Sequence, residues 1–198
     1  EKIIEFLSSQ QTGRISSIDE NGYPQIIPMN FVFINDVIYM HSHIRGEKLD
    51  NIRRNQKVGF EVDKSLEFLP SYFSDPTDAS LADTLYISVV IKGNGSIVSD
   101  REEKTTALNG LIKKYQPEGG YEPIKPEMDV LNEVEVIKIV PESLRGKYKI
   151  GQNMDMKSRI DLARQILERN SPTAKETLDI MGFEIIDGEP KLVDDKPW

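Results

Sequence analysis

Short alternations of apolar and polar residues, separated by turn residues, dominate residues 13–62 and predict antiparallel β-strands. Turns are expected at residues 19–22 and 35–36, where Asn, Asp and Gly favour tight connections. Pro28 predicts a bulge or an edge strand, because proline has no amide hydrogen to donate to a neighbouring strand. The extended segments predicted here cover residues 14–18, 25–34, 37–42 and 57–62.

Two further strands are predicted later in the chain, at residues 85–98 and 134–140. Gly93 and Gly95 interrupt the first of them, which indicates a bend or a close approach of another backbone. Residues 64–83 have few periodic signals and are expected to form a loop that can include a short helix.

Helical spacing of apolar residues replaces the strand pattern in two internal segments. Two apolar residues three apart predict a short helix within residues 46–55. The tetrapeptide at 100–103 resembles a capping box and predicts a helix that runs to about Tyr115. Residues 1–7 are expected to belong to a helix already under way rather than to a signal peptide.

The C-terminal tail is predicted to be mainly helical. Ser171-Pro172 is typical of the start of a second tail helix, which Gly182 would end. Asp187-Gly188 predicts a hairpin turn. The first tail helix, at 159–169, would carry one apolar face made of Ile160, Ala163, Ile166 and Leu167.

These elements predict a mainly β fold with helices, organised as a β-barrel domain at 1–150 and a helical extension at 151–198. We expect the extension to pack on the barrel or on a dimer. Its apolar face would also suit the recruitment of another partner.

Composition narrows the class of protein. Hydrophobic residues at 38% and charged residues at 29% are ordinary for a soluble globular protein, and no apolar run is long enough for a membrane-spanning helix. The absence of cysteine excludes disulfides and thiolate chemistry and fits a cytoplasmic protein. A net charge of −8 argues against general nucleic-acid binding, because the phosphate backbone would repel the chain.

One basic island stands out in this acidic chain and indicates a site for a small anion. The cations of the island are Arg45, Lys48, Arg53, Arg54 and Lys57, and both histidines of the chain precede them.

The two histidines, His41 and His43, would point to the same face of a strand, with Ser42 on the opposite face. They could be hydrogen-bonded or surface strand residues without further function. Two imidazoles at this spacing could also ligate zinc, but the sequence supplies no evident third ligand.

A phosphate cradle is the sharper hypothesis for the island. The strand is expected to end near Gly46, where a helix N-terminus would present free N–H groups and a partial positive charge. Lys48, Ser42 and Arg45 would add charge and a hydroxyl around the same point. The alternative is that the basic run is only the solvated face of a helix.

A longer pattern runs through segments 13–16, 22–31, 38–43, 46–52, Asn55, 58–60, 86–93, 103–104 and 144–147. This pattern closely resembles the flavin-binding split-barrel superfamily. Within it, the sequence is most similar to the pyridoxamine 5'-phosphate oxidase-related group that includes nitroimidazole-resistance reductases. The resemblance covers about residues 1–150, and the tail adds nothing to it.

This resemblance implies a six-stranded Greek-key split barrel that forms a tight homodimer, with FMN in clefts at the subunit interface. By position, Lys48 would bind the phosphate, assisted by Ser42 and His43. The residues implied to line the isoalloxazine are Pro28, Met29, Asn30, Phe31 and His41, with Phe31 also fitting a core position; second-rank candidates are Arg14, Ser16 and, from the partner subunit, Ser88. Relatives often have an aromatic or small residue where this chain has Lys92.

The resulting hypothesis is an FMN-dependent oxidoreductase that passes electrons from a reduced nicotinamide to a small molecule such as a nitro compound. Gly93-Asn94-Gly95 lacks the third glycine of a nicotinamide-binding fingerprint, so the reductant would use the flavin face directly. His41 or His43 could donate a proton to the reduced substrate. A non-catalytic flavin sensor or carrier, and a split barrel that holds haem or a deazaflavin, are the alternatives.

Overall fold

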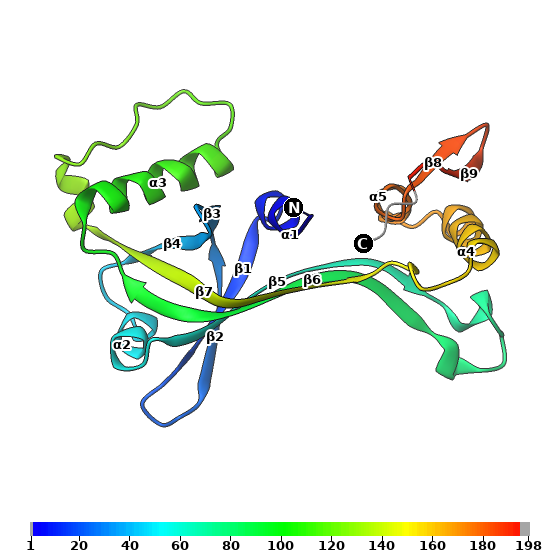
Figure 1. Ribbon diagram of the computed structural model, residues 1–198, viewed down its shortest axis with the longest axis horizontal. Helices are drawn as coiled ribbons and strands as arrows, with labels where there is room; N and C mark the ends of the chain where they lie inside the picture. The colour runs from blue at the N-terminus through cyan, green and yellow to red at the C-terminus, as the bar shows by residue number, and fades with distance from the viewer. Residues whose placement is uncertain (1, 195–198) are drawn as a thin grey trace. The chain divides into compact units, whose positions relative to one another are not determined.

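The computed structural model describes residues 2–194 as a mostly antiparallel sheet with helices (Figure 1). Three short 3-10 turns lie at Ser71–Phe73, Ala79–Leu81 and Asp129–Asn132. The helices and strands in chain order are α1 (Lys2–Ser9), β1 (Thr12–Ile18), β2 (Pro24–Asn30), β3 (Val32–Ile34), β4 (Val37–His43), α2 (Glu47–Arg54), β5 (Lys57–Leu69), β6 (Asp83–Ile97), α3 (Arg101–Tyr115), β7 (Val134–Lys149), α4 (Met156–Arg169), α5 (Ala174–Ile180), β8 (Phe183–Ile186) and β9 (Glu189–Leu192).

The chain divides into two compact units. The first comprises the residues up to Val62 and Val89–Gly146, and the second comprises Asp63–Ser88 and the residues from Lys147 onward. Strands β5, β6 and β7 contribute residues to both units. The expected division near residue 150, and the packing of the tail on the barrel or on a dimer, stay predictions.

The strand order of the main sheet explains why it curls into a barrel. Its seven strands run β2-β1-β5-β6-β7-β4-β3, so β2 and β3 are the two ends of the order. These two strands are consecutive in the chain and only Phe31 separates them. The two ends of the sheet must therefore meet at Phe31, which confirms the barrel class; the seventh strand arises because Phe31 divides one predicted strand into two.

Phe31 is fully buried where the two ends meet. Its ring packs edge-on against Phe60, with the ring centroids 5.1 Å apart. A β-carbon at Gly13 would lie only 2.1 Å from the tip of the Phe60 ring, so glycine is required for this ring to fit. The Phe31 side chain therefore belongs to the core, which is one of the two positions predicted for it.

Helix α3 supplies polar partners for the same point. The Phe31 N–H donates to the Tyr115 hydroxyl at 2.9 Å, and that hydroxyl donates to the Gln11 carbonyl at 2.5 Å. Lys114 Nζ lies 3.8 Å from the centroid of the Phe31 ring and donates to the Leu7 carbonyl at 3.2 Å. One turn of α3 thus holds the residue before β1, the β2–β3 junction and α1 together.

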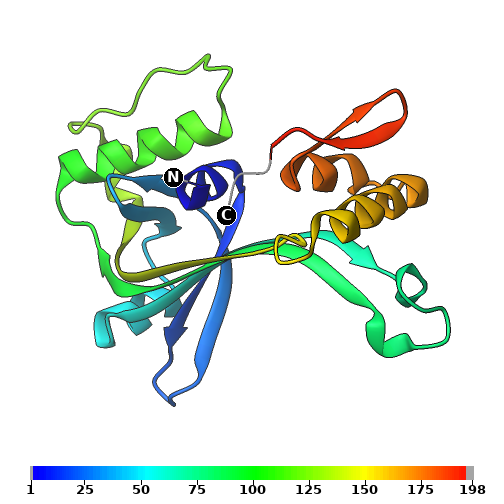
Figure 2. The same ribbon diagram turned by 45° about the vertical axis from the view of Figure 1, so that its right-hand side comes forward.

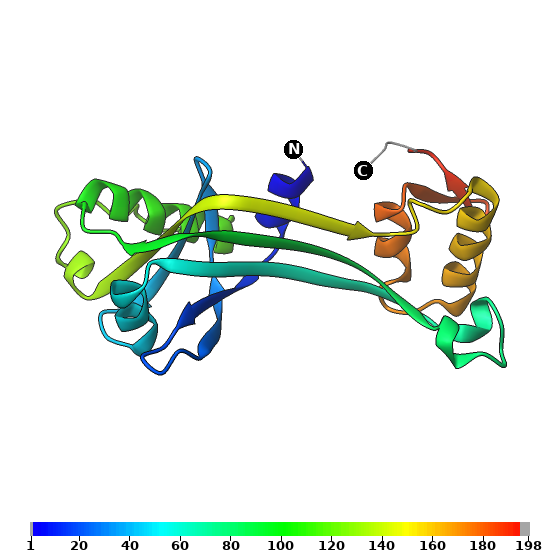
Figure 3. The same ribbon diagram turned by 60° about the horizontal axis from the view of Figure 1, so that its bottom comes forward.

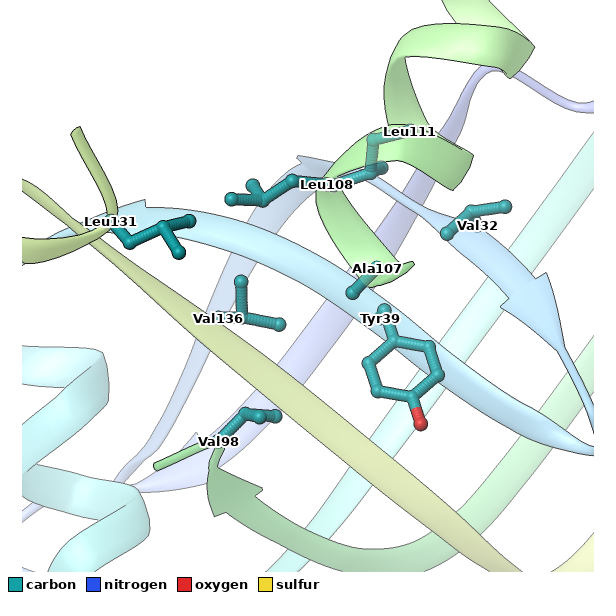
Figure 4. Packing of buried hydrophobic residues seen from close by; sticks show 8 residues of the cluster. All are labelled: Val32, Tyr39, Val98, Ala107, Leu108, Leu111, Leu131 and Val136. Carbon is teal, nitrogen blue, oxygen red and sulfur yellow. The ribbon is translucent and has the colours of Figure 1, made fainter. Parts of the chain in front are cut away.

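The rest of α3 covers β3, β4 and β7 through a second apolar cluster (Figure 4). The predicted helix start at Asp100 is confirmed, because the Asp100 carboxylate accepts from the Glu103 N–H at 2.7 Å. The Glu103 carboxylate, which would complete a capping box, bonds to other elements instead. Tyr39 on β4 donates from its hydroxyl to Glu103 at 2.9 Å, and Lys138 on β7 pairs with the same carboxylate. Burial, and then the bond to this carboxylate, raise the pKa of Tyr39 to about 12.

Two strands are longer than predicted. Residues 64–69, expected in a loop, continue β5, and residues 141–149 continue β7 beyond the predicted end at Val140. The β4 register ends at Ile139, so Pro141 lies where its missing N–H removes no bond to β4. The close approach at Gly93 is confirmed, since a β-carbon there would lie 2.4 Å from the Val140 carbonyl oxygen.

The second unit contains both predicted tail helices and the hairpin (Figure 2). Helices α4 and α5 lie side by side (Figure 3), and α4 buries Leu162, Ala163 and Ile166, whereas Ile160 and Leu167 are only half-buried. The hairpin turn is confirmed, with positive φ angles of 55° and 81° at Asp187 and Gly188.

The predicted start of α5 at Ser171-Pro172 is wrong, because the helix begins at Ala174. The Ser171 hydroxyl donates instead to Glu67, a carboxylate of β5 that is 2% exposed. Thr173 and Arg169 donate to the same carboxylate, each at 2.9 Å. A buried charge with this many donors is tolerated, so Glu67 can occupy a buried position in the extended β5.

Removal of the Tyr115 hydroxyl tests the role of the β2–β3 junction. Tyr115→Phe would leave the Phe31 N–H without its partner, and we expect the free energy of unfolding to fall by about 1–3 kcal/mol. Tyr72→Phe makes the same chemical change at a side chain that is 60% exposed, so it should change stability by less than about 0.5 kcal/mol. Equal urea midpoints for the two variants would contradict this role.

The pH dependence of stability tests the environment of Lys114. Burial lowers the pKa of Lys114 from 10.5 to about 8 in the folded chain. Between these pH values the unfolded chain keeps a proton that the folded chain has released, so the free energy of unfolding should rise with pH. Lys114→Met should lose this rise, whereas Lys113→Met, at an exposed neighbour, should keep it. Parallel stability–pH curves for the wild type and Lys114→Met would show that the prediction is wrong.

Candidate functional site

The end of β4 separates the candidate residues onto two faces, as predicted. Ser42 is buried, whereas His41 and His43 on either side of it are exposed. The Ser42 hydroxyl donates to the His43 carbonyl at 3.0 Å, and the Arg45 N–H donates to His43 Nδ1 at 3.2 Å. These local bonds hold the backbone between the end of β4 and Gly46.

Gly46 forms the turn into α2. Its φ of 152° and ψ of 149° lie in a region that residues with a side chain rarely adopt. Its carbonyl accepts the Leu49 N–H at 2.9 Å, and no side chain caps this helix start. The first N–H groups of α2 are thus presented at its positive end.

Lys48 brings its charge to the same point. A β-carbon at Gly46 would lie 3.8 Å from Lys48 Nζ, so a side chain there would enter the space beside the ammonium. The glycine keeps this space open between a cation and the amide groups of a helix start. This donor set fits a phosphate group.

Other cations of the basic island have different roles. Arg53 pairs with Asp50 at 3.0 Å, Arg54 donates to the Ile18 carbonyl at 3.4 Å, and Lys57 pairs with Glu142 at 2.7 Å. Among residues 2–194, these bonds narrow the predicted anion site to Lys48 and Arg45.

The candidates on β1 and β2 form a separate group on one face of these strands. Arg14 lies opposite Pro28 in the register, Ser16 opposite Ile26, and Asn30 opposite Thr12. Arg14 also pairs with Glu61 of β5 at 3.1 Å, which occupies one of its donors. The side chains of Pro28 and Asn30 are exposed, as a flat wall or a polar edge for a ring system requires.

The remaining candidates lie elsewhere. Met29 is opposite Gly13 and half-buried on the inner face of the barrel, and the Phe31 ring is in the core. Ser88 is half-buried on β6 and belongs to the second unit. Its contact with a partner-bound flavin stays a prediction.

Asn51 is a residue that the sequence reasoning missed. Its side chain is fully buried on α2, between the buried Leu49 and Ile52. The Asn51 amide donates to Ser17 Oγ at 3.2 Å and to Gln25 Oε1 at 3.3 Å. A polar residue within the apolar face of a short helix was the available signal.

Comparison with known families decides the wider assignment. The family model described as pyridoxamine 5'-phosphate oxidase matches residues 1–148. The chain belongs to this family. Membership supports a flavin-binding function of the oxidoreductase type, and the matched segment contains the Ser42–Lys48 turn. The search of curated proteins found no match.

Several solved structures share this fold at low sequence identity. A candidate 5-nitroimidazole antibiotic resistance protein from Bacteroides thetaiotaomicron is 22% identical with a TM-score of 0.62, over 74% of this chain and 82% of that one. The flavocytochrome Anf3 from Azotobacter vinelandii is 17% identical with a TM-score of 0.63, over 75% and 66%. An FAD and haem binding protein from Mycobacterium smegmatis is 13% identical with a TM-score of 0.64, over 82% and 76%. At these identities the likeness shows a shared fold alone.

Two further observations concern membrane-spanning helices and metal-binding clusters. Among the described helices none is long and apolar enough to cross a membrane. Within residues 2–194 no group of three or more His, Asp and Glu side chains is placed to hold a metal ion.

A substitution at Gly46 tests the turn that opens the site. Gly46→Ala forces a side chain into a backbone conformation that favours glycine, and we expect a loss of about 1–3 kcal/mol in the free energy of unfolding. At Gly59 a β-carbon would make only an ordinary contact, 3.6 Å from Ser16 Cβ, so Gly59→Ala is the matched control and should have a small effect. An unchanged urea midpoint for Gly46→Ala would show that the turn tolerates a side chain.

Proposed function

We propose that this chain is an FMN-dependent oxidoreductase that acts on a small molecule as a cytoplasmic homodimer. The observation that carries the proposal is the Ser42–Lys48 turn, where a helix start, an open glycine and a cation meet. The phosphate of a phosphorylated flavin would accept bonds from this turn, and flavin binding is the function that membership of the family supports.

The phosphate would be held by Lys48 and by the N–H groups at the start of α2. Ser42 now donates to the His43 carbonyl, so its hydroxyl would have to rotate to reach a phosphate oxygen. His43 would contribute through its exposed ring beside the same turn.

The ring system would lie against Pro28, Asn30 and the backbone of Met29 between them, with His41 at its edge. Two residues before Pro28, Ile26 is 63% exposed, and Tyr23, which directly precedes β2, is 70% exposed. Exposed apolar side chains beside the residues proposed to contact the isoalloxazine are typical of a surface that becomes buried when a second copy of the chain binds. Ser88 of that second copy would complete the site.

Bound FMN would supply the redox chemistry, with two electrons taken from a reduced nicotinamide and passed to a small acceptor such as a nitro compound. Because His41 and His43 are exposed, either ring can exchange protons with solvent and deliver one to the reduced acceptor.

Comparison of FMN with riboflavin tests the phosphate site, because the two ligands differ only in the phosphate. In Lys48→Ala the dissociation constant for FMN should rise about 10- to 100-fold, since a charge-assisted bond is lost. Riboflavin binding should be nearly unchanged. Arg53→Ala removes an exposed cation from the other end of α2 and should leave both affinities within about twofold of the wild type.

Fluorescence titration of the three proteins gives these constants. Equal losses of FMN and riboflavin affinity in Lys48→Ala would contradict a phosphate contact. Wild-type protein that binds neither ligand would contradict the flavin proposal as a whole.

A further inference from the structure

The buried amide of Asn51 connects α2 to two strands at once. The acceptors of its Nδ2, Ser17 on β1 and Gln25 on β2, are direct partners in the antiparallel register. Ser17 is itself buried, and Gln25 is half-buried. A single side chain therefore bonds to a cross-strand pair, which fixes both the position and the rotation of the helix against the strands.

The carbonyl oxygen of Asn51 is also engaged. Its Oδ1 accepts from the Arg54 guanidinium at 3.3 Å, and the same nitrogen of Arg54 reaches the Ile18 carbonyl at 3.4 Å. The buried amide thus has partners for both its nitrogen and its oxygen, as a buried polar group requires.

Directional bonds matter here because α2 is short. A helix of eight residues has little stability of its own and takes its orientation from its surroundings. The buried Leu49 and Ile52 hold it against the barrel, but apolar contacts are non-directional and allow the helix to rock. The Asn51 bonds remove that freedom.

The distance between Asn51 and Gly46 links the orientation of α2 to the anion site. Asn51 is five residues from Gly46, or about 7.5 Å along the axis. A tilt of about 10° around Asn51 would move the first N–H groups of α2 by roughly 1.3 Å, which is enough to weaken hydrogen bonds to a fixed group.

We propose that Asn51 is a positioning residue for the FMN phosphate, which acts by orienting the N-terminus of α2. This inference rests on the proposed function, because the phosphate that Asn51 would help to position is the one proposed to bind at the Ser42–Lys48 turn. Asn51 does not touch the phosphate. It sets where the N–H groups and Lys48 lie when the phosphate binds.

The test again uses the ratio of FMN to riboflavin affinity, which a loss of stability alone would not change. Asn51→Leu keeps the size of the side chain and removes its bonds; the FMN affinity should fall about tenfold and the riboflavin affinity by less than about twofold. Ile52→Val is the matched control. It weakens the apolar anchor of the same helix but keeps the directional bonds, so the ratio should stay at the wild-type value.

Ser17→Ala provides a second, milder variant if Asn51→Leu does not fold. It removes one of the two acceptors, and the ratio should fall about threefold. Circular dichroism identifies the variants that are folded.

The outcomes separate this inference from the proposed function. A wild-type chain that prefers FMN, with the same preference in folded Asn51→Leu or Ser17→Ala, would overturn the role of Asn51 and leave the phosphate site intact. A wild-type chain that binds both ligands equally would overturn the phosphate site and the positioning role together. A selective loss of FMN affinity in the variants, with Ile52→Val unchanged, supports the inference.

Discussion

A single buried residue between the two end strands of the sheet is the constraint on which the rest of the first unit depends. Because β2 and β3 end the strand order and only Phe31 lies between them, the sheet has to close there. Closure buries the Phe31 ring against Phe60 and brings its backbone to the Tyr115 hydroxyl. Helix α3, which supplies that hydroxyl, is thereby fixed over the strands that deliver the candidate site.

The closed barrel also supports the candidate site at the end of β4. The chain leaves β4 at His43, turns through Gly46 and enters α2, which the buried Leu49 and Ile52 hold against the barrel. In a chain with a net charge of −8, anion binding depends on local groups, because distant charges are screened over about 8 Å at physiological salt. The ammonium of Lys48 beside the open start of a helix provides such a local group.

The sequence was most informative where local rules decide the structure. Strand alternation, the Asp100 N-cap, the short helix after Gly46 and the Asp187-Gly188 turn depend on near neighbours in the chain, and each was predicted. The extension of β5 was not predicted. A charged residue such as Glu67 is unexpected in a buried strand position until its donors from the distant tail are known. Asn51 was missed for the same reason, since its partners on β1 and β2 become neighbours only in the folded chain.

Identification of the bound chromophore tests the central claim, that this barrel holds a phosphorylated flavin, most directly. The measurement is the visible absorption spectrum of the purified protein, followed by the mass of the chromophore released on denaturation. The account predicts a flavin spectrum and the mass of FMN. A colourless protein that also fails to bind added FMN would contradict it, and a haem spectrum would transfer the chemistry to His41 and His43.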